Sequence, residues 1–338
     1  MSDHLLGSVL VAPLLTMLVI RALVDLLWPR TAVVACTVAA VLVAAASMIS
    51  LAALAAPAAV ELWALVVGTG PVTDAWRTAV TPRWLSWASL VAFCAQVGAV
   101  GATVRRQRLG LRSARAQAAA LPGAAEVVVV PDDRVDAFAL PGSPGRIVVT
   151  SGMMSALTAE QREIVIAHER AHLAARHHRF SFAARLAAAA HPGLRAVAPT
   201  LEYAVERWAD EDAARVIRDR RVVARAISTA ALLTTSPHAV CGTTTLHIGS
   251  FRRDPGRRRR VVGGRYGAPV SARRRRLPSG SGPVPRRVAA LLVPPPGNRL
   301  NRIALSALPA ALAAASCGLA IEALVDLPLP FAFTNRDC

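Results

Sequence analysis

The sequence predicts an integral membrane protein that is mainly α-helical and carries a small antiparallel sheet. Three observations lead to this fold class. The chain of 338 residues is 54% hydrophobic and only 18% charged, and its mean hydropathy is +0.42, whereas an average soluble domain is about 25% charged. Several apolar runs reach the roughly 20 residues that cross a bilayer. Between them lie three short runs with strand character and two long segments with helical periodicity.

Four apolar segments are predicted to span the membrane as helices. A cleaved signal peptide is the alternative for the first, but that segment lacks a positively charged start and its apolar run is long. The expected spans are residues 5–28, 31–56, 84–104 and 303–327. The predicted domains are 1–104 with three spans, 105–233 as a cytoplasm-facing domain, 234–302 as a largely disordered Arg/Pro/Gly-rich linker, 303–327 as the fourth span and 328–338 as a short tail.

The net charge of +18 is concentrated in two arginine clusters. One extends from Arg105 to Arg115, directly after the third predicted span, and the other extends from Arg252 to Arg276. The positive-inside rule places both clusters in the cytoplasm and therefore both termini outside. Anionic lipid is the simpler partner for the arginine-rich linker, because aromatic residues are scarce near it and no nucleic-acid-binding motif is present.

Three short runs between the third and fourth spans predict strands. They are residues 126–130, 136–140 and 146–150, each rich in small or β-branched side chains. Turn signals close each run: Pro131-Asp132-Asp133, Pro141-Gly142 and Ser151-Gly152. Short strands separated by such turns predict an antiparallel meander.

The period then changes to that of a helix. Thr158 and Gln161 form the pattern of a capping box, and no Gly or Pro interrupts residues 159–190. A second helical segment is expected over residues 201–233. In the first segment, His168 and His172 fall on the same face one turn apart, with Glu169 between them.

The motif His168-Glu169-Arg170-Ala171-His172 matches the H-E-x-x-H pattern of zinc enzymes. Two imidazoles at i and i+4 can bind one metal ion from a single helix face, and the intervening Glu is held beside the reacting water. The alternative is an exposed polar face on an alanine-rich helix. We interpret His177 and His178 as solvated residues at a membrane interface.

A catalytic zinc site requires a third protein ligand. The acidic candidates downstream are Glu202, Glu206, Asp210, Glu211 and Asp212. Glu206 and Asp210 share a helix face, so the first can bind the metal while the second accepts a hydrogen bond from a ligand histidine. Glu202 lies on the same face and remains the rival ligand.

The pair of motifs His168–His172 and Glu206-Arg-Trp-Ala-Asp210 resembles the membrane zinc metallopeptidases of the HtpX and CAAX prenyl protease type. It is also similar to the metallopeptidase domain of β-lactam sensor proteins. The resemblance implies a gluzincin-type fold with one zinc ion per chain, bound by His168, His172 and Glu206. It makes Glu169 the general base and Asp210 a carboxylate behind the ligands. The peptide substrate is expected to add as a strand along the sheet, at Arg146, Ile147, Val148, Val149 and Thr150.

The sequence therefore predicts a membrane-bound zinc metalloendopeptidase that acts on a protein or peptide substrate, with its active site in the cytoplasm. Two alternatives remain open. One is a signal transducer that cleaves a single cytoplasmic regulator, and the other is a catalytically idle scaffold whose basic linker binds lipid or a partner. The presence of Glu169 argues against the scaffold, because a scaffold has no need of a general base.

Overall fold

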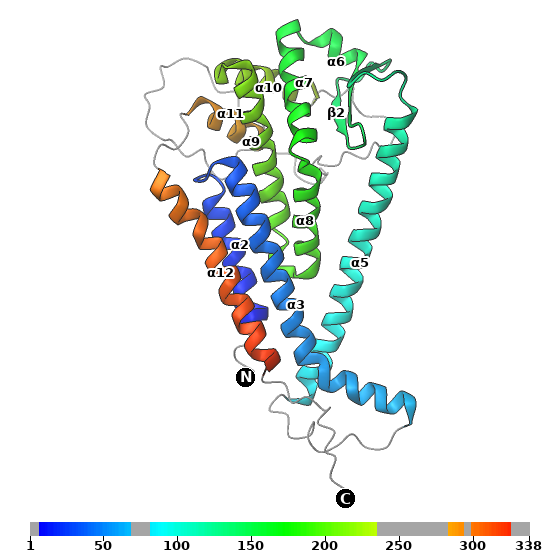
Figure 1. Cartoon of the computed structure of the whole chain (residues 1–338), viewed down its shortest axis with the longest axis vertical. Helices are drawn as coiled ribbons and strands as arrows, with labels where there is room; N and C mark the ends of the chain where they lie inside the picture. Colours follow the sequence, from blue (N-terminus) through cyan, green and yellow to red (C-terminus); the bar gives the residue numbers. More distant parts are fainter. Residues whose placement is uncertain (1–6, 69–81, 235–282, 294–298, 326–338) are drawn as a thin grey trace, which may run out of the picture. The chain divides into compact units, whose positions relative to one another are not determined.

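The computed structural model describes residues 7–68, 82–234, 283–293 and 299–325. These residues are mainly helical and include one three-stranded sheet, as predicted (Figure 1). They belong to two compact units. The first unit comprises Met1–Arg112, Arg179–Trp208 and Pro296–Cys338, and the second comprises Ser113–His178 and Ala209–Pro295.

The first unit contains the most apolar helices of the chain. Its elements are η1 (Gly7–Val11), α2 (Ala12–Leu23), α3 (Pro29–Val67), most of α5 (Arg83–Ala120), most of α8 (His177–Ala190), η2 (Pro192–Leu194), the first half of α9 (Val197–Ile217) and α12 (Arg299–Val325). In Figure 1, α2, α3 and α12 lie side by side.

Two of these helices, α3 and α5, are long and apolar enough to cross a membrane. The prediction of four spans is therefore wrong for the described part of the chain, which gives two candidates. The first predicted span fails because α2 ends at Leu23 and the chain then turns, which leaves a short apolar helix, Val9–Leu23. In the last predicted span the chain forms the helix α12, Arg299–Val325, but within its described residues the apolar stretch is Ala307–Gly318, which alone is too short to count as a membrane span.

Several predictions fall outside the described residues. These are the arginine cluster from Arg252 to Arg276, the disorder of residues 235–282, the two termini and the tail 328–338. The predicted linker also included residues 283–292, which the structure shows as the helix α11 (Pro283–Leu292). This part of the linker is therefore helical, and Val284, Val288 and Leu291 recur there at helical spacing behind a proline at the helix start.

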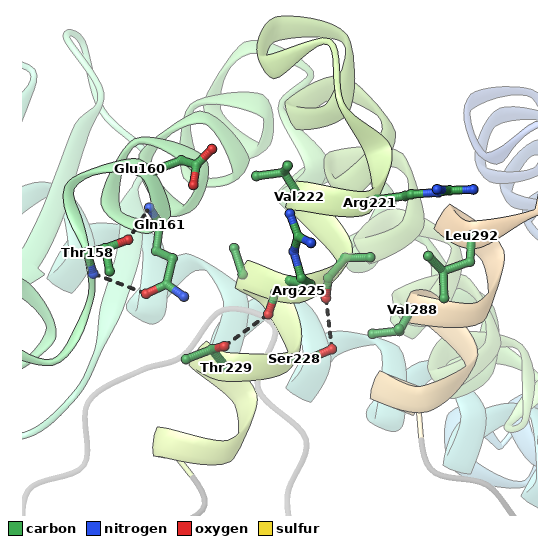
Figure 2. Close-up of a pocket in the computed structure, with 12 residues that line it drawn as sticks. Thr158, Glu160, Gln161, Arg221, Val222, Arg225, Ser228, Thr229, Val288 and Leu292 are labelled. Carbon is green, nitrogen blue, oxygen red and sulfur yellow. Dashed lines mark hydrogen bonds between the residues drawn. The ribbon is translucent and has the colours of Figure 1, made fainter. Parts of the chain in front are cut away.

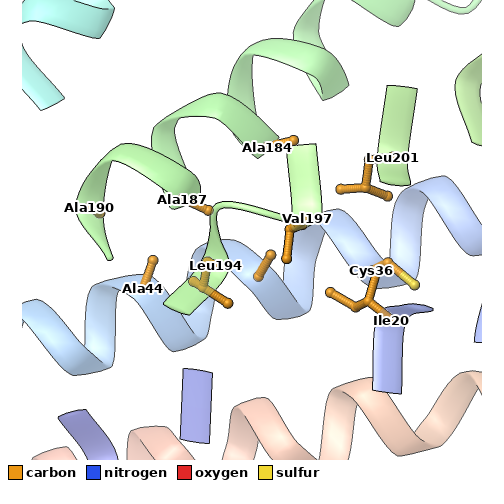
Figure 3. Close-up of a cluster of buried hydrophobic side chains, with 10 residues drawn as sticks. Ile20, Cys36, Ala44, Ala184, Ala187, Ala190, Leu194, Val197 and Leu201 are labelled. Atoms are coloured by element: carbon orange, nitrogen blue, oxygen red, sulfur yellow. The ribbon is translucent and has the colours of Figure 1, made fainter. Parts of the chain in front are cut away.

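A hairpin made of α8, η2 and α9 packs against α2 and α3 within the first unit (Figure 3). The buried residues of this cluster are Ile20, Cys36, Ala40, Ala44, Ala184, Ala187, Ala190, Leu194, Val197 and Leu201. Five of them are alanines, whose small side chains let the helices approach closely. The start of α9 is fixed further by polar contacts to the turn after α2. Tyr203 donates a hydrogen bond to Asp25 at 3.0 Å, and Arg207 donates to the Val24 carbonyl at 2.8 Å.

The second unit combines the sheet with the rest of the helices. Its elements are the end of α5, β1 (Val127–Val130), β2 (Ala137–Leu140), β3 (Arg146–Thr150), α6 (Ser151–Ala156), α7 (Ala159–Ala174), the end of α9, α10 (Arg220–Thr234) and α11. Buried side chains of α7, α9, α10 and α11 form one apolar cluster that includes Ile164, Ala213, Val223 and Leu291.

The sheet has the order β1-β3-β2, with β3 in the centre. β2 pairs antiparallel to β3, whereas β1 pairs parallel to it, with Val128 opposite Val148. The predicted antiparallel meander is therefore wrong. The prediction failed at the turn after β1. The segment 131–136 does not form a hairpin there but crosses the end of β3. As a result, β1 and β2 flank the same strand.

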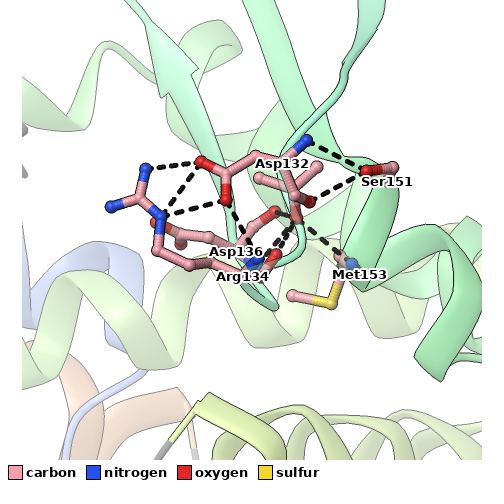
Figure 4. Close-up of polar contacts among 6 residues, drawn as sticks. Asp132, Arg134, Asp136, Ser151 and Met153 are labelled. Carbon is pink, nitrogen blue, oxygen red and sulfur yellow. Dashed lines mark hydrogen bonds and ion pairs between the residues drawn. The ribbon is translucent and has the colours of Figure 1, made fainter. Parts of the chain in front are cut away.

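This crossing segment is pinned to the end of β3 by hydrogen bonds (Figure 4). The Asp132 amide donates to the Ser151 hydroxyl at 3.0 Å, and that hydroxyl donates to the Asp132 carbonyl at 2.9 Å. The Asp136 amide donates to the Thr150 hydroxyl at 3.1 Å. A Cβ at Gly152 would lie 2.2 Å from the Asp133 carbonyl oxygen, so this close approach requires glycine.

Candidate metal centre

The helix α7 presents the two motif histidines as the sequence predicted. The capping box at its start is present, with Thr158 and Gln161 exchanging side-chain and backbone hydrogen bonds. One turn separates His168 from His172, and their Nε2 atoms lie 3.2 Å apart. Both side chains are partly buried. The two nitrogens that can bind a metal therefore face the same point.

Glu206 on α9 places a carboxylate oxygen near the two histidine nitrogens. One ligand atom from each of His168, His172 and Glu206 lies within 4.8 Å of the other two. The division between the two compact units falls within α9, just after Trp208. The continuous helix therefore carries both Glu206 and Asp210, one turn apart.

The rival ligand, Glu202, has a different partner. Its carboxylate lies 3.5 Å from Nε of Arg185, the neighbour on α8. Burial raises the pKa of Glu202; Arg185 opposes this effect and the negative charge of Glu206 adds to it. The geometry thus groups Glu206, and not Glu202, with the histidines.

Asp210 lies beside Nδ1 of His168, the ring nitrogen that does not face His172. Its Oδ1 lies 3.0 Å from Nδ1 of His168, and its side chain is only 2% exposed. Arg287 of α11 binds the same carboxylate with two hydrogen bonds, of 2.7 Å from Nε and 2.6 Å from Nη2. Burial alone would raise the pKa of Asp210, but Arg287 and His168 outweigh it and keep that pKa below its usual range. The carboxylate of Asp210 therefore contacts both His168 and Arg287.

The C-terminal end of α11, the helix that carries Arg287, is fixed to α10. Arg220 donates hydrogen bonds to the carbonyls of Leu291 at 2.9 Å and Ala290 at 3.0 Å. Its guanidinium also binds Glu211 of α9 at 2.8 Å. These contacts satisfy carbonyls at the end of α11 that have no partner within the helix, and they hold α11 against the helices of the metal centre.

The helix predicted over residues 159–190 is broken. It ends at Ala174, and Arg176 adopts a left-handed backbone conformation with φ of 52° before α8 starts at His177. No Gly or Pro marks this break, so the sequence pattern could not show it. The break turns the buried His177 toward His172, whose Nδ1 lies 3.1 Å from His177 Nδ1. The interpretation of His177 as a solvated residue is therefore wrong.

The donor set fits a zinc ion. Two imidazole nitrogens and a carboxylate oxygen are a usual set for catalytic zinc. Nitrogens bound tetrahedrally at about 2.0–2.1 Å lie about 3.3 Å from each other, and the two Nε2 atoms are 3.2 Å apart. The remaining nitrogen of each imidazole has a polar partner, as ligand histidines usually do.

Comparison with known proteins supports this assignment. Residues 102–205 match the model of Peptidase family M48. The chain carries an M48 peptidase domain. No curated protein and no solved structure matches the chain. The match to the M48 model includes His168, Glu169 and His172 but ends one residue before Glu206, so the third ligand of the M48 domain rests on the geometry described above. The resemblance to β-lactam sensor proteins stays a prediction.

The strand predicted to receive the substrate is excluded from that role. Arg146, Ile147, Val148, Val149 and Thr150 form β3, which has β1 on one side and β2 on the other. All five residues are buried, and Arg146 donates hydrogen bonds to the carbonyls of Pro122 and Gly123. Its backbone edges are occupied, so β3 cannot pair with an added peptide. The error follows from the wrong strand order.

A separate cavity in the second unit lies where the start of α7 faces α10 and α11 (Figure 2). Thr158 and Gln161 line one side, and Arg225 and Val288 are among the residues of the other. The residues that line this cavity do not include the three ligands of the metal group. The cavity is therefore not the metal centre.

Proposed function

We propose that the protein is a membrane-bound zinc metalloendopeptidase. The observation that carries the proposal is the meeting of His168, His172 and Glu206 around one point, within a chain that matches an M48 peptidase model. This complete donor set favours an active enzyme over the alternative of an idle scaffold. The chemistry that zinc supplies in such a site is activation of a water molecule and polarisation of the substrate carbonyl.

Glu169 is the general base in this proposal. It follows His168 directly on α7 and is partly buried. A carboxylate at this position in the motif is held beside the reacting water and takes its proton, which it can then deliver to the leaving amine. Asp210 keeps His168 in the orientation and tautomer that metal binding requires.

The substrate edge of the sheet is β2 in this proposal. Among the described residues, β2 has a strand neighbour on one side, β3, and it packs against α7, the helix of the metal ligands. A peptide that adds alongside β2 would hydrogen-bond through its backbone. Main-chain pairing of this kind selects extended segments of a protein, which suits an endopeptidase.

We also propose that α3 and α5 anchor the enzyme in the membrane. Both meet the length and composition of a membrane span. The arginines from Arg105 to Arg115 lie on the second half of α5, after its apolar part. By the positive-inside rule this half, and with it the metal centre, faces the cytoplasm, where the basic side chains attract anionic lipid.

The experiment that tests the function combines zinc content with peptide cleavage. The wild-type protein in detergent should contain one zinc ion per chain. Glu169→Gln should retain the zinc, because it removes no ligand, and cleavage should fall by about 10²–10⁴-fold, the usual contribution of a general base. Glu163→Gln is the matched control, because Glu163 is an exposed residue on the same helix. A Glu169→Gln protein with wild-type cleavage would overturn the mechanism.

The ligand assignment is tested with a second pair of carboxylates. Glu206→Gln should lower both the zinc content and cleavage, whereas Glu202→Gln should retain its zinc, because Glu202 contacts Arg185. Zinc lost from Glu202→Gln but not from Glu206→Gln would move the third ligand one turn toward the start of α9. A wild-type protein that binds no zinc would refute the proposed function as a whole.

A further inference from the structure

The second ligand histidine meets another imidazole on the side away from its metal-facing nitrogen. Nδ1 of His172 lies 3.1 Å from Nδ1 of His177, and the two rings meet edge-on with their centroids 4.8 Å apart. His177 is only 1% exposed. This contact joins α7 to α8 at the point where the left-handed Arg176 separates the two helices.

The chemistry of the contact follows from the nitrogen that His172 turns to the metal. An imidazole that binds a metal through Nε2 keeps its proton on Nδ1. A hydrogen bond between two facing nitrogens needs one donor and one acceptor. Nδ1–H of His172 must therefore donate, and Nδ1 of His177 must accept, so His177 carries its own proton on Nε2.

We propose that His177 is a positioning residue that orients His172 for zinc binding. It would fix the ring plane and the tautomer of His172, as Asp210 does for His168 across a distance of 3.0 Å. The proposal rests on the metal site proposed above. It explains why the chain adopts an unfavourable left-handed conformation at a non-glycine residue, since a continuous α-helix would carry His177 past the face of His172.

The burial of His177 supports this role. A histidine with no function beyond packing could be replaced there by an apolar ring, which would avoid the cost of burying polar nitrogens. In the structure, one of those nitrogens lies within hydrogen-bonding distance of a ligand histidine. Partners of this kind usually contribute about 10–100-fold to metal affinity or activity.

The test uses two variants of almost equal shape, His177→Asn and His177→Leu. The Asn side chain keeps an acceptor oxygen, whereas Leu removes it, and both leave a similar cavity. Zinc affinity would be measured by competition with a chromophoric chelator, and site geometry by the visible absorption of the Co²⁺-loaded proteins. We expect His177→Leu to bind zinc about 10–100-fold more weakly and to change the Co²⁺ spectrum. His177→Asn should stay close to wild type in both measurements.

The neighbouring substitution His178→Leu is the control, and it should leave zinc affinity unchanged. Equal affinities of the Leu and Asn variants, whether both weak or both like wild type, would overturn the proposal, because the acceptor would then make no difference. Should His177→Leu fail to fold, ¹⁵N NMR of the wild-type zinc form decides. A protonated Nδ1 on His172 that is coupled across a hydrogen bond to His177 is expected, and a protonated Nε2 on His172 would overturn the proposal.

These outcomes are distinct from failure of the proposed function. A wild-type protein without zinc affinity would refute the metal site itself. A wild-type protein that binds zinc tightly, together with a His177→Leu protein that binds it equally well, would leave the metal site intact and refute the role of His177 alone.

Discussion

His168 and His172 are equivalent in the sequence motif, but their far nitrogens meet different partners. Nδ1 of His168 faces Asp210, a buried carboxylate that Arg287 binds with two hydrogen bonds. Nδ1 of His172 faces His177, a buried imidazole only five residues along the chain. One histidine thus contacts an ion pair between distant segments, and the other contacts a residue of the next helix along the chain.

The two contacts differ in the backbone that they require and in the groups that they bury. The contact of His172 requires the backbone break at Arg176 and is made between two imidazole rings. The contact of His168 places a carboxylate and a guanidinium there, each of which loses most of its hydration. Such a pair is costly to break, because the remaining partner is left buried and charged. The two sides of the metal centre should therefore respond differently to substitution.

The largest effect on stability is expected from breaking the ion pair at Arg287. Arg287→Met keeps the length of the side chain but leaves Asp210 buried without its cation. Loss of one partner of a buried pair usually costs about 3–5 kcal/mol. Chemical unfolding in detergent, followed by circular dichroism, would measure this loss. Arg221→Met, at an exposed position on the neighbouring helix α10, should change the free energy of unfolding by less than about 0.5 kcal/mol.

If Arg287→Met lowered the free energy of unfolding as little as Arg221→Met, Asp210 and Arg287 would not be a buried pair in which each residue depends on the other. That result would also remove the reason for assigning α11 to the metal centre, because Arg287 is the residue through which this helix reaches Asp210.

The double variant Asp210→Asn with Arg287→Met sharpens the comparison. Removing both charges takes away the unpaired carboxylate, so most of the stability lost in Arg287→Met should return. The Asn oxygen can still accept a hydrogen bond from His168, but the negative charge that makes this ligand more basic is gone. Zinc affinity should therefore remain about 10–100-fold weaker than in wild type. Unfolding and chelator competition on the same samples would separate the two roles.

A double variant that is as unstable as Arg287→Met would show that Arg287 acts through packing and not through charge. Recovery of both stability and zinc affinity would show that any hydrogen-bond acceptor suffices beside His168. In that case the two sides of the centre would be equivalent after all.

The spacing of the motifs predicted which side chains share a helix face because each motif lies within one helix. His168 and His172 are four residues apart on α7, and Glu206 and Asp210 are four apart on α9. Helical periodicity fixes the faces of such pairs from sequence alone. The pairing of the two helices came from the family resemblance, and the structure brings together His168, His172 and Glu206, which could hold a metal ion.

The supporting residues were missed because their positions depend on tertiary structure. Arg287 lies 77 residues beyond Asp210, and the short amphipathic pattern of α11 was obscured by the arginine-rich composition around it. His177 depends on a left-handed residue that carries no glycine. The strand order was missed for a similar reason, because turn residues after β1 mark a change of direction but do not decide between a hairpin and a crossing over β3.

The smallest effect on stability is expected at an ion pair of similar chemistry whose side chains are more exposed, 38% for Arg134 and 27% for Asp132. Arg134 and Asp132 form side-chain hydrogen bonds in the segment that crosses β3, with Nε of Arg134 lying 3.1 Å from one carboxylate oxygen and 3.0 Å from the other (Figure 4). The Arg134 side chain, and then its backbone amide, lower the pKa of Asp132 from 3.8 to about 2. Because the folded-state pKa is the lower one, the pair stabilises the fold above about pH 3.8, and that contribution is lost as the pH falls toward 2.

Arg134→Ala should raise the pKa of Asp132 only part of the way to 3.8, since the amide of residue 134 still donates to the carboxylate at 2.9 Å in the wild type. Carbon NMR titration of the carboxyl group would measure the shift. At neutral pH the loss of stability should be far below that of Arg287→Met, because water can replace the missing partner at this more exposed site. An equal loss in the two variants would mean that burial does not distinguish the pairs, and that the contrast between the two ligand histidines needs another cause.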